Sequence, residues 1–395
     1  MTNFNRRKFL KASGLSALPL VVPVLPAIAS GHGVYQSPAP ERAITFTSDG
    51  EFFSTPNYIA KLQEISTAKG IAPDIYGSGG AVAALEKKFT EITGKEKAIF
   101  MPSGTMANQF AIHVLSGENT KVFVQETSHV YRDEADAAQS VFNKRLIPVG
   151  KGQTGFTADE LKEAVDYHKQ GEVFASGMGA VSIENPVRRA DGRMMPIDEL
   201  RKIAAYCKQE GLKLHLDGAR LYMASAWSGV SIAEYSSLFD TVYISLYKYL
   251  GASGGAILCG DKATIDKMPH LMKIHGGTMF GNWTNAAMAL HMVEGFDARI
   301  QQARKRADEL FVLLKNSLDI KATVLQNGTN IHFLQLPKPV KPEVFSATIR
   351  QEYNMRVIQP DAKGMMRFMI NETILYRDVN AIVDAFRAGM KAAAV

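Results

Sequence analysis

The sequence predicts an α/β protein in which a large domain with a mainly parallel sheet precedes a smaller α+β domain. Short apolar runs alternate with amphipathic stretches through the first two thirds of the chain, as in strands joined by helices. Apolar residues recur at helical spacing over residues 82–92 and 197–207, and a glycine follows each stretch. After about residue 280 a long helical pattern leads into shorter strands. We therefore expect a large domain over residues 44–280 and a small domain over residues 281–395.

The expected strands indicate where a ligand would bind. Those of the large sheet are residues 98–101, 122–125, 180–184, 213–217, 241–245 and 256–258. Those of the small domain are residues 323–325, 331–336 and 366–370, with a long helix before them and a last helix over residues 379–392. Ligands of parallel sheets bind beyond the carboxyl ends of the strands. The residues that directly follow each apolar run are therefore the candidates for chemistry.

The composition is that of an ordinary globular protein. Of the 395 residues, 46% are hydrophobic and 21% are charged, which argues against a disordered chain, and the length is more than one small core requires. The formal net charge is +6, but the basic residues are scattered and form no stripe with interleaved aromatic residues. Nucleic-acid binding is therefore not expected.

Residues 1–29 have the pattern of a bacterial export signal. The pair Arg6-Arg7, followed by Lys8-Phe9-Leu10, resembles a twin-arginine (Tat) signal, and an apolar stretch ends in small residues around Ala29 that suit a signal peptidase. A membrane anchor is the alternative, but the apolar stretch is short and three prolines interrupt it. We expect cleavage, a periplasmic location, no membrane association afterwards and a flexible lead-in over residues 30–43.

Cysteine usage indicates neither a disulfide framework nor a metal centre. Cys207 lies in a helical pattern and Cys259 ends an apolar strand, so we expect two buried free thiols. The sequence has no cysteine cluster with metal-ligand spacing, and we expect no metal site.

Three features after expected strands carry the chemistry. Ser103-Gly104-Thr105 follows the first strand and opens a helix, where backbone amides and hydroxyls can bind a phosphate, although the same residues also make a helix cap. Asp217 ends another strand, as a ligand or as a helix cap or ion-pair partner. Lys248 lies between a strand and a glycine-rich stretch, where burial would lower its pKa and make it a nucleophile; the alternative is a surface lysine.

Together these features have the order found in pyridoxal-phosphate (PLP) enzymes of the aspartate-aminotransferase fold, known as fold type I. In such enzymes the lysine binds the cofactor aldehyde, the aspartate pairs with the pyridine nitrogen, and a helix start holds the phosphate. Lys248 follows Asp217 by about thirty residues, which matches this order.

The sequence resembles the low-specificity threonine aldolases of the β-eliminating lyase group over roughly residues 44–392. The most specific blocks are Ser103–Gln109, which reads Ser-Gly-Thr-Met-Ala-Asn-Gln, and His215–Leu221, which reads His-Leu-Asp-Gly-Ala-Arg-Leu. The other matching segments are Ser48-Asp49, Ile75-Tyr76-Gly77, Leu85-Glu86, Thr93–Glu96, Glu126–His129 and Gly192-Arg193.

The resemblance implies roles for further residues. His129 corresponds to a histidine that stacks on the PLP ring, and Arg220 is expected near the ring oxygen. Ser48 and Arg367 are expected to bind the substrate, with Arg367 on its carboxylate because a planar guanidinium suits that group. Lys248 and His129 are the expected catalytic residues. The family also implies an amino acid as the small-molecule substrate and a homodimer or homotetramer with sites at subunit interfaces.

The sequence departs from the family where the substrate is expected. The family reads Glu-Asn-Thr-His-Asn where this chain has Glu184-Asn185-Pro186-Val187, so a second histidine is missing. Tyr247 and Tyr249 flank the lysine in place of Ser and Gly, and the loop at residues 276–281 lacks the family's arginine. Cofactor-binding residues are retained better than substrate-binding ones.

We expect a PLP-dependent lyase that cleaves the Cα–Cβ bond of a threonine-like β-hydroxy-α-amino acid to glycine and an aldehyde. With the second histidine absent, His129 or a water must accept the hydroxyl proton. The alternatives are another PLP reaction, namely β-elimination, transamination or racemisation, or a periplasmic binding protein of the same fold without catalysis. A nicotinamide dehydrogenase is least favoured, because no G-x-G-x-x-G follows the first strand.

Overall fold

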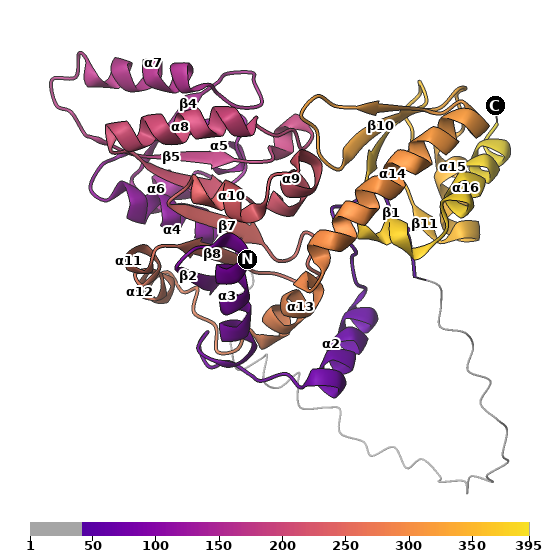
Figure 1. Ribbon diagram of the computed structural model, residues 1–395, viewed down its shortest axis with the longest axis horizontal. Coiled ribbons are helices and arrows are strands. Elements are labelled where there is room, and N and C mark those ends of the chain that lie inside the picture. Colours follow the sequence, from indigo (N-terminus) through magenta and orange to yellow (C-terminus); the bar gives the residue numbers. More distant parts are fainter. Residues whose placement is uncertain (1–41, 395) are drawn as a thin grey trace, which may run out of the picture. The chain divides into compact units, whose positions relative to one another are not determined.

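The computed structural model describes residues 42–394 (Figure 1). The expected export signal at residues 1–29 and most of the expected lead-in at residues 30–43 lie outside this range. Within it, no helix has both the length and the apolar character needed to cross a bilayer.

A seven-stranded sheet with the order β2-β8-β7-β6-β5-β3-β4 forms the centre of the fold. The five strands β7, β6, β5, β3 and β4, neighbours in this order, run parallel to one another, whereas β8 runs antiparallel to both of its neighbours, β2 and β7. The strands are β2 (Lys97–Met101), β3 (Lys121–Gln125), β4 (Arg145–Val149), β5 (Met178–Glu184), β6 (Lys213–Asp217), β7 (Thr241–Ser245) and β8 (Ala256–Gly260). The mainly parallel sheet was predicted. Strand β4 was missed, because this edge strand contains Pro148 and is only partly buried, which weakens the apolar signal.

Helices cover both faces of the sheet because its strands are apolar on both sides (Figure 1). Along β2, Ala98 and Phe100 pack into the larger core, whereas Ile99 and Met101 pack into a second core on the opposite face. The larger core contains residues of α3 (Gly80–Thr93), α7 (Ala158–Lys169), α8 (Ile197–Glu210), α9 (Leu221–Ser228), α10 (Ile232–Ser237) and α13 (Trp283–Val293). The other face carries α4 (Gly104–Ser116), α6 (Ala137–Phe142), α11 (Lys262–Ile265) and α12 (Met268–Ile274).

The C-terminal part contains a three-stranded antiparallel sheet, as expected for a small α+β domain. Its strand order is β12-β10-β9, with β9 (Lys321–Val324), β10 (Ile331–Gln335) and β12 (Met365–Met369). The helices of this part are α14 (Phe296–Leu318), α15 (Pro342–Tyr353) and α16 (Val379–Ala392).

The first residues of the described chain also pack with the C-terminal part. Strand β1 (Ile44–Thr45) pairs in parallel with β11 (Met355–Arg356), and the Phe46 ring stacks on Phe368 at 4.1 Å between centroids. The expected domain boundaries at residues 44 and 280 stay predictions, but β1 itself pairs outside the range given to the large domain. A two-residue strand carries no periodicity from which this pairing could be predicted.

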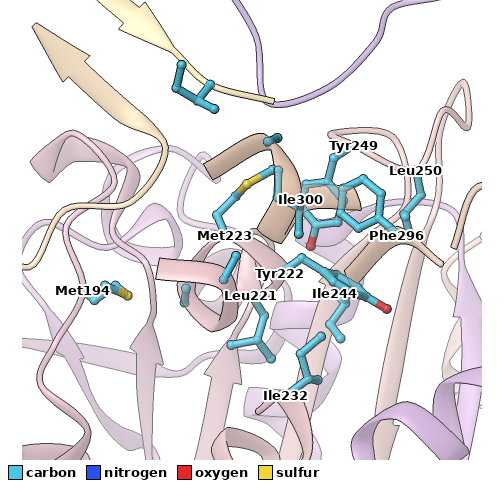
Figure 2. Packing of buried hydrophobic residues seen from close by; sticks show 14 of the residues in the cluster. Met194, Leu221, Tyr222, Met223, Ile232, Ile244, Tyr249, Leu250, Phe296 and Ile300 are labelled. Atoms are coloured by element: carbon cyan, nitrogen blue, oxygen red, sulfur yellow. The ribbon is translucent and has the colours of Figure 1, made fainter. Parts of the chain in front are cut away.

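Tyr249 fixes the backbone next to Lys248. Its ring is almost fully buried and stacks on Phe296, the first residue of α14, at 5.4 Å, while Tyr222 of α9 meets its edge at 5.6 Å (Figure 2). Aromatic pairs of this kind add to the stability that comes from burial alone. The tyrosine that replaces the family's glycine therefore anchors the lysine loop to two helices.

Both cysteines are buried free thiols, as predicted. Cys207 lies in α8 and Cys259 in β8. Burial raises the pKa of each thiol to about 12, so neither is a reactive thiolate at neutral pH.

Candidate active site

Six of the seven residues predicted for the cofactor, all except Arg220, line one cavity of about 200 Å³. Ser103, Gly104 and Thr105 follow β2, Asp217 ends β6, and Lys248 follows β7, all at the carboxyl edge of the sheet. His129, at the start of the short helix α5 (His129–Arg132) after β3, lines the same cavity. The parallel direction of β2, β3, β6 and β7 thus brings together side chains that are far apart in the sequence.

Asp217 is held by hydrogen bonds on both carboxylate oxygens. The Asn108 side-chain amide donates to Oδ2 at 2.9 Å, and the backbone amide of Ala219 donates to Oδ1 at 3.1 Å. The Asn108 amide oxygen in turn lies 3.0 Å from His215 Nε2, and His215 Nδ1 lies 2.8 Å from the Thr241 hydroxyl. Burial lowers the pKa of His215 to about 4, so this histidine is neutral and serves as a fixed support for Asp217.

His129 is connected to the same network through Glu134. Its Nδ1 lies 2.9 Å from Glu134 Oε1, and that oxygen also accepts a hydrogen bond of 2.8 Å from Asn108. The hydrogen bond with Glu134 raises the pKa of His129 above its usual value. The backbone amide of His129 donates to Glu184 Oε2 at 2.7 Å. Backbone and ring of His129 are therefore both fixed.

Lys248 has the electrostatic environment of a nucleophilic amine. Burial, followed by the nearby Arg220 guanidinium, lowers the pKa of Lys248 to about 8. Arg220 itself donates from Nε to Asp49 Oδ2 at 2.7 Å. Gly50 permits this arrangement, because a Cβ there would lie 2.6 Å from the Tyr249 Cα and 3.1 Å from the Lys248 carbonyl oxygen.

The start of α4 is suited to an anion. Ser103 caps the helix by accepting a hydrogen bond from the Met106 amide at 3.2 Å, and the first amides of any helix lack intrahelical partners. Position 104 requires glycine, because a Cβ there would lie 2.1 Å from the Tyr243 hydroxyl oxygen. The cap that the sequence allowed as an alternative is thus present, and the same residues line the cavity.

A second, larger cavity of about 890 Å³ adjoins the first, and Lys248, His129 and Tyr247 line both. Ser48, Arg220 and Arg367 line the larger one. Arg367 lies in β12, with its Nε 3.6 Å from Asp191 Oδ1 and without a hydrogen-bond partner in the described structure. Every residue predicted for the site therefore lies in one of these two connected cavities.

Several neighbouring residues were not predicted. Asn108 lies inside the quoted 103–109 block, and Glu184 ends β5, so the rule that selected Asp217 could have selected Glu184 as well. Glu134 lies on a loop and Asp133 at the end of α5, whereas Arg188 and Arg189 lie in the short 3₁₀ helix η1 (Arg188–Ala190). None of the four gave a sequence signal.

One group of side chains in the described structure has the geometry of a metal site. His129, Glu134 and Asp217 place ligand atoms within 4.8 Å of one another. These side chains are already linked by the hydrogen bonds given above: His129 bonds to Glu134, and the Asn108 amide donates to both Glu134 and Asp217. The expectation of no metal stays a prediction.

The described residues fit PLP. An acceptor carboxylate, a lysine with a lowered pKa and a helix start lie around one cavity, and these are the partners that the ring nitrogen, the aldehyde and the phosphate require. The fold and the site thus define a PLP-dependent enzyme of fold type I.

Comparisons with known proteins agree with this class. Residues 60–338 match the family model described as Beta-eliminating lyase. The chain is 32% identical over 322 residues to a low-specificity L-threonine aldolase of Candida albicans, covering 80% of this chain and 84% of that protein. A probable low-specificity L-threonine aldolase of Arabidopsis thaliana is 29% identical, with 79% and 88% covered. The solved structure of a putative L-allo-threonine aldolase from Listeria monocytogenes has a TM-score of 0.72 at 23% identity, with 89% and 97% covered.

The chain belongs to the beta-eliminating lyase family. It is a PLP-dependent lyase, and the predictions of the fold class, the cofactor and the enzyme class are confirmed. The roles assigned to individual residues stay predictions, although the structure places all of them around the two cavities.

Proposed function

We propose that this enzyme cleaves a β-hydroxy-α-amino acid into glycine and an aldehyde, as a threonine aldolase does. The observation that carries the proposal is the convergence of Lys248, Asp217 and His129 on one cavity that opens to Ser48 and Arg367. The relatives from Candida albicans and Arabidopsis thaliana, whose names describe this activity, support it.

Three parts of the chain would hold the cofactor. Lys248 supplies the amine for the aldehyde, Asp217 pairs with the ring nitrogen, and the start of α4 receives the phosphate. When bound, PLP supplies an electron sink for the bond that breaks. The lowered pKa of Lys248, about 8, leaves part of the amine uncharged near neutral pH, which is the form that attacks a carbonyl.

Arg367 and Ser48 orient the substrate in the larger cavity. The Arg367 guanidinium has an unused buried donor and binds the α-carboxylate, while Ser48 lines the same cavity. Fixing the carboxylate sets the direction of the Cα–Cβ bond relative to the smaller cavity. Such positioning makes a large contribution to catalysis.

His129 accepts the proton of the β-hydroxyl group, either directly or through a water. Its Nδ1 is occupied by Glu134, which leaves Nε2 for the substrate side. The Glu134 carboxylate stabilises the imidazolium that forms when the proton arrives. This arrangement replaces the second histidine that the family has and this chain lacks.

The chemical test is to compare products. The purified enzyme with PLP is expected to release aldehyde and glycine from threonine and phenylserine, and to release little pyruvate from serine. Pyruvate as the main product, with no aldehyde from any substrate, contradicts the proposal.

Racemisation is the second candidate. An alanine racemase of Cochliobolus carbonum is 33% identical to this chain over 233 residues, which cover 57% of this chain and 58% of that protein. Formation of D-alanine from L-alanine, faster than aldehyde release from any β-hydroxy amino acid, would favour this candidate.

We further propose that the enzyme is exported by a Tat signal to the periplasm and works as a homodimer or homotetramer. The residue pattern at positions 1–29 supports the first point. Exposed apolar side chains support the second: Ile75, Tyr76 and Phe280 are each more than half exposed, and the Tyr76 and Phe280 rings meet edge to face at 5.4 Å. Cell fractionation and light scattering test the two points separately.

A further inference from the structure

Two arginines occupy the part of the larger cavity where this chain departs from its family. Arg188 and Arg189 follow Pro186-Val187, at the point where the family has its second histidine, and both line the same cavity as Lys248 and Arg367. Their side chains are about half exposed. The retro-aldol reaction as described gives neither arginine a task.

The arginine pair is fixed relative to His129 by two separate links. The buried Glu184 carboxylate accepts hydrogen bonds from the backbone amides of both His129, at 2.7 Å, and Arg188, at 2.9 Å. Asp133, which follows α5 and therefore lies one turn after His129, binds both guanidinium groups. The arginines therefore have a defined position relative to His129, the residue proposed to accept the β-hydroxyl proton.

The pair carries one positive charge more than its partner neutralises. Arg189 binds Asp133 with two hydrogen bonds, of 2.8 Å to Oδ2 and 2.5 Å to Oδ1, whereas Arg188 donates one of 3.1 Å to Oδ2. A guanidinium has five N–H donors, so Arg188 retains donors for another acceptor. Partly exposed ion pairs contribute little stability, so Arg188 can turn toward a second carboxylate at small cost.

We propose that Arg188, supported by Arg189, binds a second carboxylate on the substrate side chain, so that the preferred substrate is a β-hydroxy dicarboxylic amino acid such as β-hydroxyaspartate. This inference rests on the proposed aldolase function and names its substrate class. The observation that the pair already binds the Asp133 carboxylate shows that its geometry suits that group.

The reaction on this substrate balances as it does on threonine. The Cα–Cβ bond breaks, the β-hydroxyl proton passes to His129 or water, and Cβ becomes the aldehyde carbon of glyoxylate. The electron pair of the broken bond returns to Cα with a proton and gives glycine. The second carboxylate takes no part in the bond changes and serves only for recognition.

Two aromatic residues of the same cavity offer a competing preference. Phe52 and Tyr247 line the same cavity and are 63% and 40% exposed, and they would favour an aromatic side chain as in phenylserine. A comparison of substrates decides whether the arginine pair or the aromatic residues determine the preferred side chain.

The first experiment measures kcat/KM of the PLP-loaded enzyme for β-hydroxyaspartate, threonine and phenylserine by aldehyde release. We expect β-hydroxyaspartate to be preferred over threonine by roughly tenfold or more, since its second carboxylate makes charged hydrogen bonds that threonine cannot make. Arg188→Ala should lower this ratio about tenfold, and Asp133→Asn, which frees both guanidinium groups, should raise it. Opposite effects at two touching residues are not expected of a merely structural role.

Arg193→Ala is the matched control. Arg193 belongs to the same turn but lines a different cavity, so its removal should leave the substrate ratio unchanged. The inference would be overturned if the wild-type enzyme had a lower kcat/KM for β-hydroxyaspartate than for threonine, or if it preferred phenylserine. It would also be overturned if Arg188→Ala left the ratio of kcat/KM for β-hydroxyaspartate over threonine unchanged.

A binding measurement separates this inference from the proposed function. Aspartate has the second carboxylate but no β-hydroxyl group, and alanine has neither. Titration calorimetry of the PLP-loaded enzyme is expected to give tighter binding of aspartate than of alanine, with the difference reduced in Arg188→Ala. If no β-hydroxy amino acid yields aldehyde but aspartate still binds more tightly, the aldolase proposal fails and the carboxylate site stands. If threonine yields aldehyde but aspartate binds no more tightly than alanine, the aldolase proposal stands and the carboxylate site fails.

Discussion

The two cavities of the site are built differently. The cofactor cavity is bounded by buried groups, such as Asp217 and the Tyr243 ring, whose hydrogen bonds and close contacts leave little freedom. The substrate cavity is bounded by partly exposed charged side chains, such as Arg188 and Arg367, which pair mainly with nearby carboxylates. The residues predicted to bind the cofactor match the family, whereas the substrate cavity combines matching residues, such as Ser48 and Arg367, with the arginine pair that follows the departure at Pro186-Val187. Changes in the first should therefore affect all substrates, whereas changes in the second at residues that contact the substrate side chain, such as Arg188, should affect mainly the choice of substrate.

Replacing Lys248 should have the largest effect. Lys248→Ala removes the amine that binds the cofactor, and we expect kcat for aldehyde release from every substrate to fall by roughly a thousandfold or more. The control is Lys208→Ala, at an exposed position in α8. Activity that survives in Lys248→Ala would contradict the distinction between the two cavities, because the residue expected to bind the cofactor would then be dispensable.

Replacing Asn108 should disrupt the hydrogen-bond network of the cofactor cavity as a whole. Asn108→Ala takes a partner from Asp217, Glu134 and His215 at once, and each unsatisfied buried group costs about 1–3 kcal/mol. We expect a lower melting temperature and PLP affinity reduced by about tenfold or more. The ratio of kcat/KM between substrates should stay constant. A changed ratio of kcat/KM between substrates would show that the cofactor cavity also influences the choice of substrate.

Much of the cofactor cavity could be predicted from the sequence, but little of the substrate cavity. Ser103, Asp217 and Lys248 each follow an apolar run, so strand periodicity and the rule for parallel sheets were sufficient to find them. Glu134 and Asp133 could not be found in this way, because their positions depend on how α5 turns after β3. Arg188 directly follows the segment in which the family's second histidine is missing, and no pattern in the sequence indicated a role for it. The pairing of β1 with β11 depends on tertiary contacts alone.

The fit at position 104 can be tested by a pair of substitutions. Gly104→Ala places a methyl group against the Tyr243 hydroxyl, and overpacking of this kind costs about 1–3 kcal/mol of unfolding free energy. Tyr243→Phe removes the hydroxyl that causes the closest contact. In the double variant we expect part of the loss in stability, measured by denaturant unfolding, to be recovered. Simple additivity of the two losses would contradict the close contact.

Removing the charge of Glu134 should shift a pH profile rather than abolish activity. The hydrogen bond with Glu134 raises the pKa of His129, so Glu134→Gln should lower that pKa. If His129 must be unprotonated to accept the hydroxyl proton, the acidic limb of the kcat/KM profile moves to lower pH in the variant. A limb that stays in place would assign the proton to another acceptor.

The most direct test of the account is to find where the cofactor attaches. Reduction of the PLP-loaded enzyme with borohydride should fix the cofactor covalently, and peptide mass spectrometry should locate the added mass on Lys248. Before reduction, the rate of PLP uptake by the cofactor-free enzyme should rise with pH around a midpoint of about 8, because the uncharged Lys248 amine is the reactive form. An added mass on another lysine, or no added mass on a protein supplied with PLP, would contradict the assignment of the site.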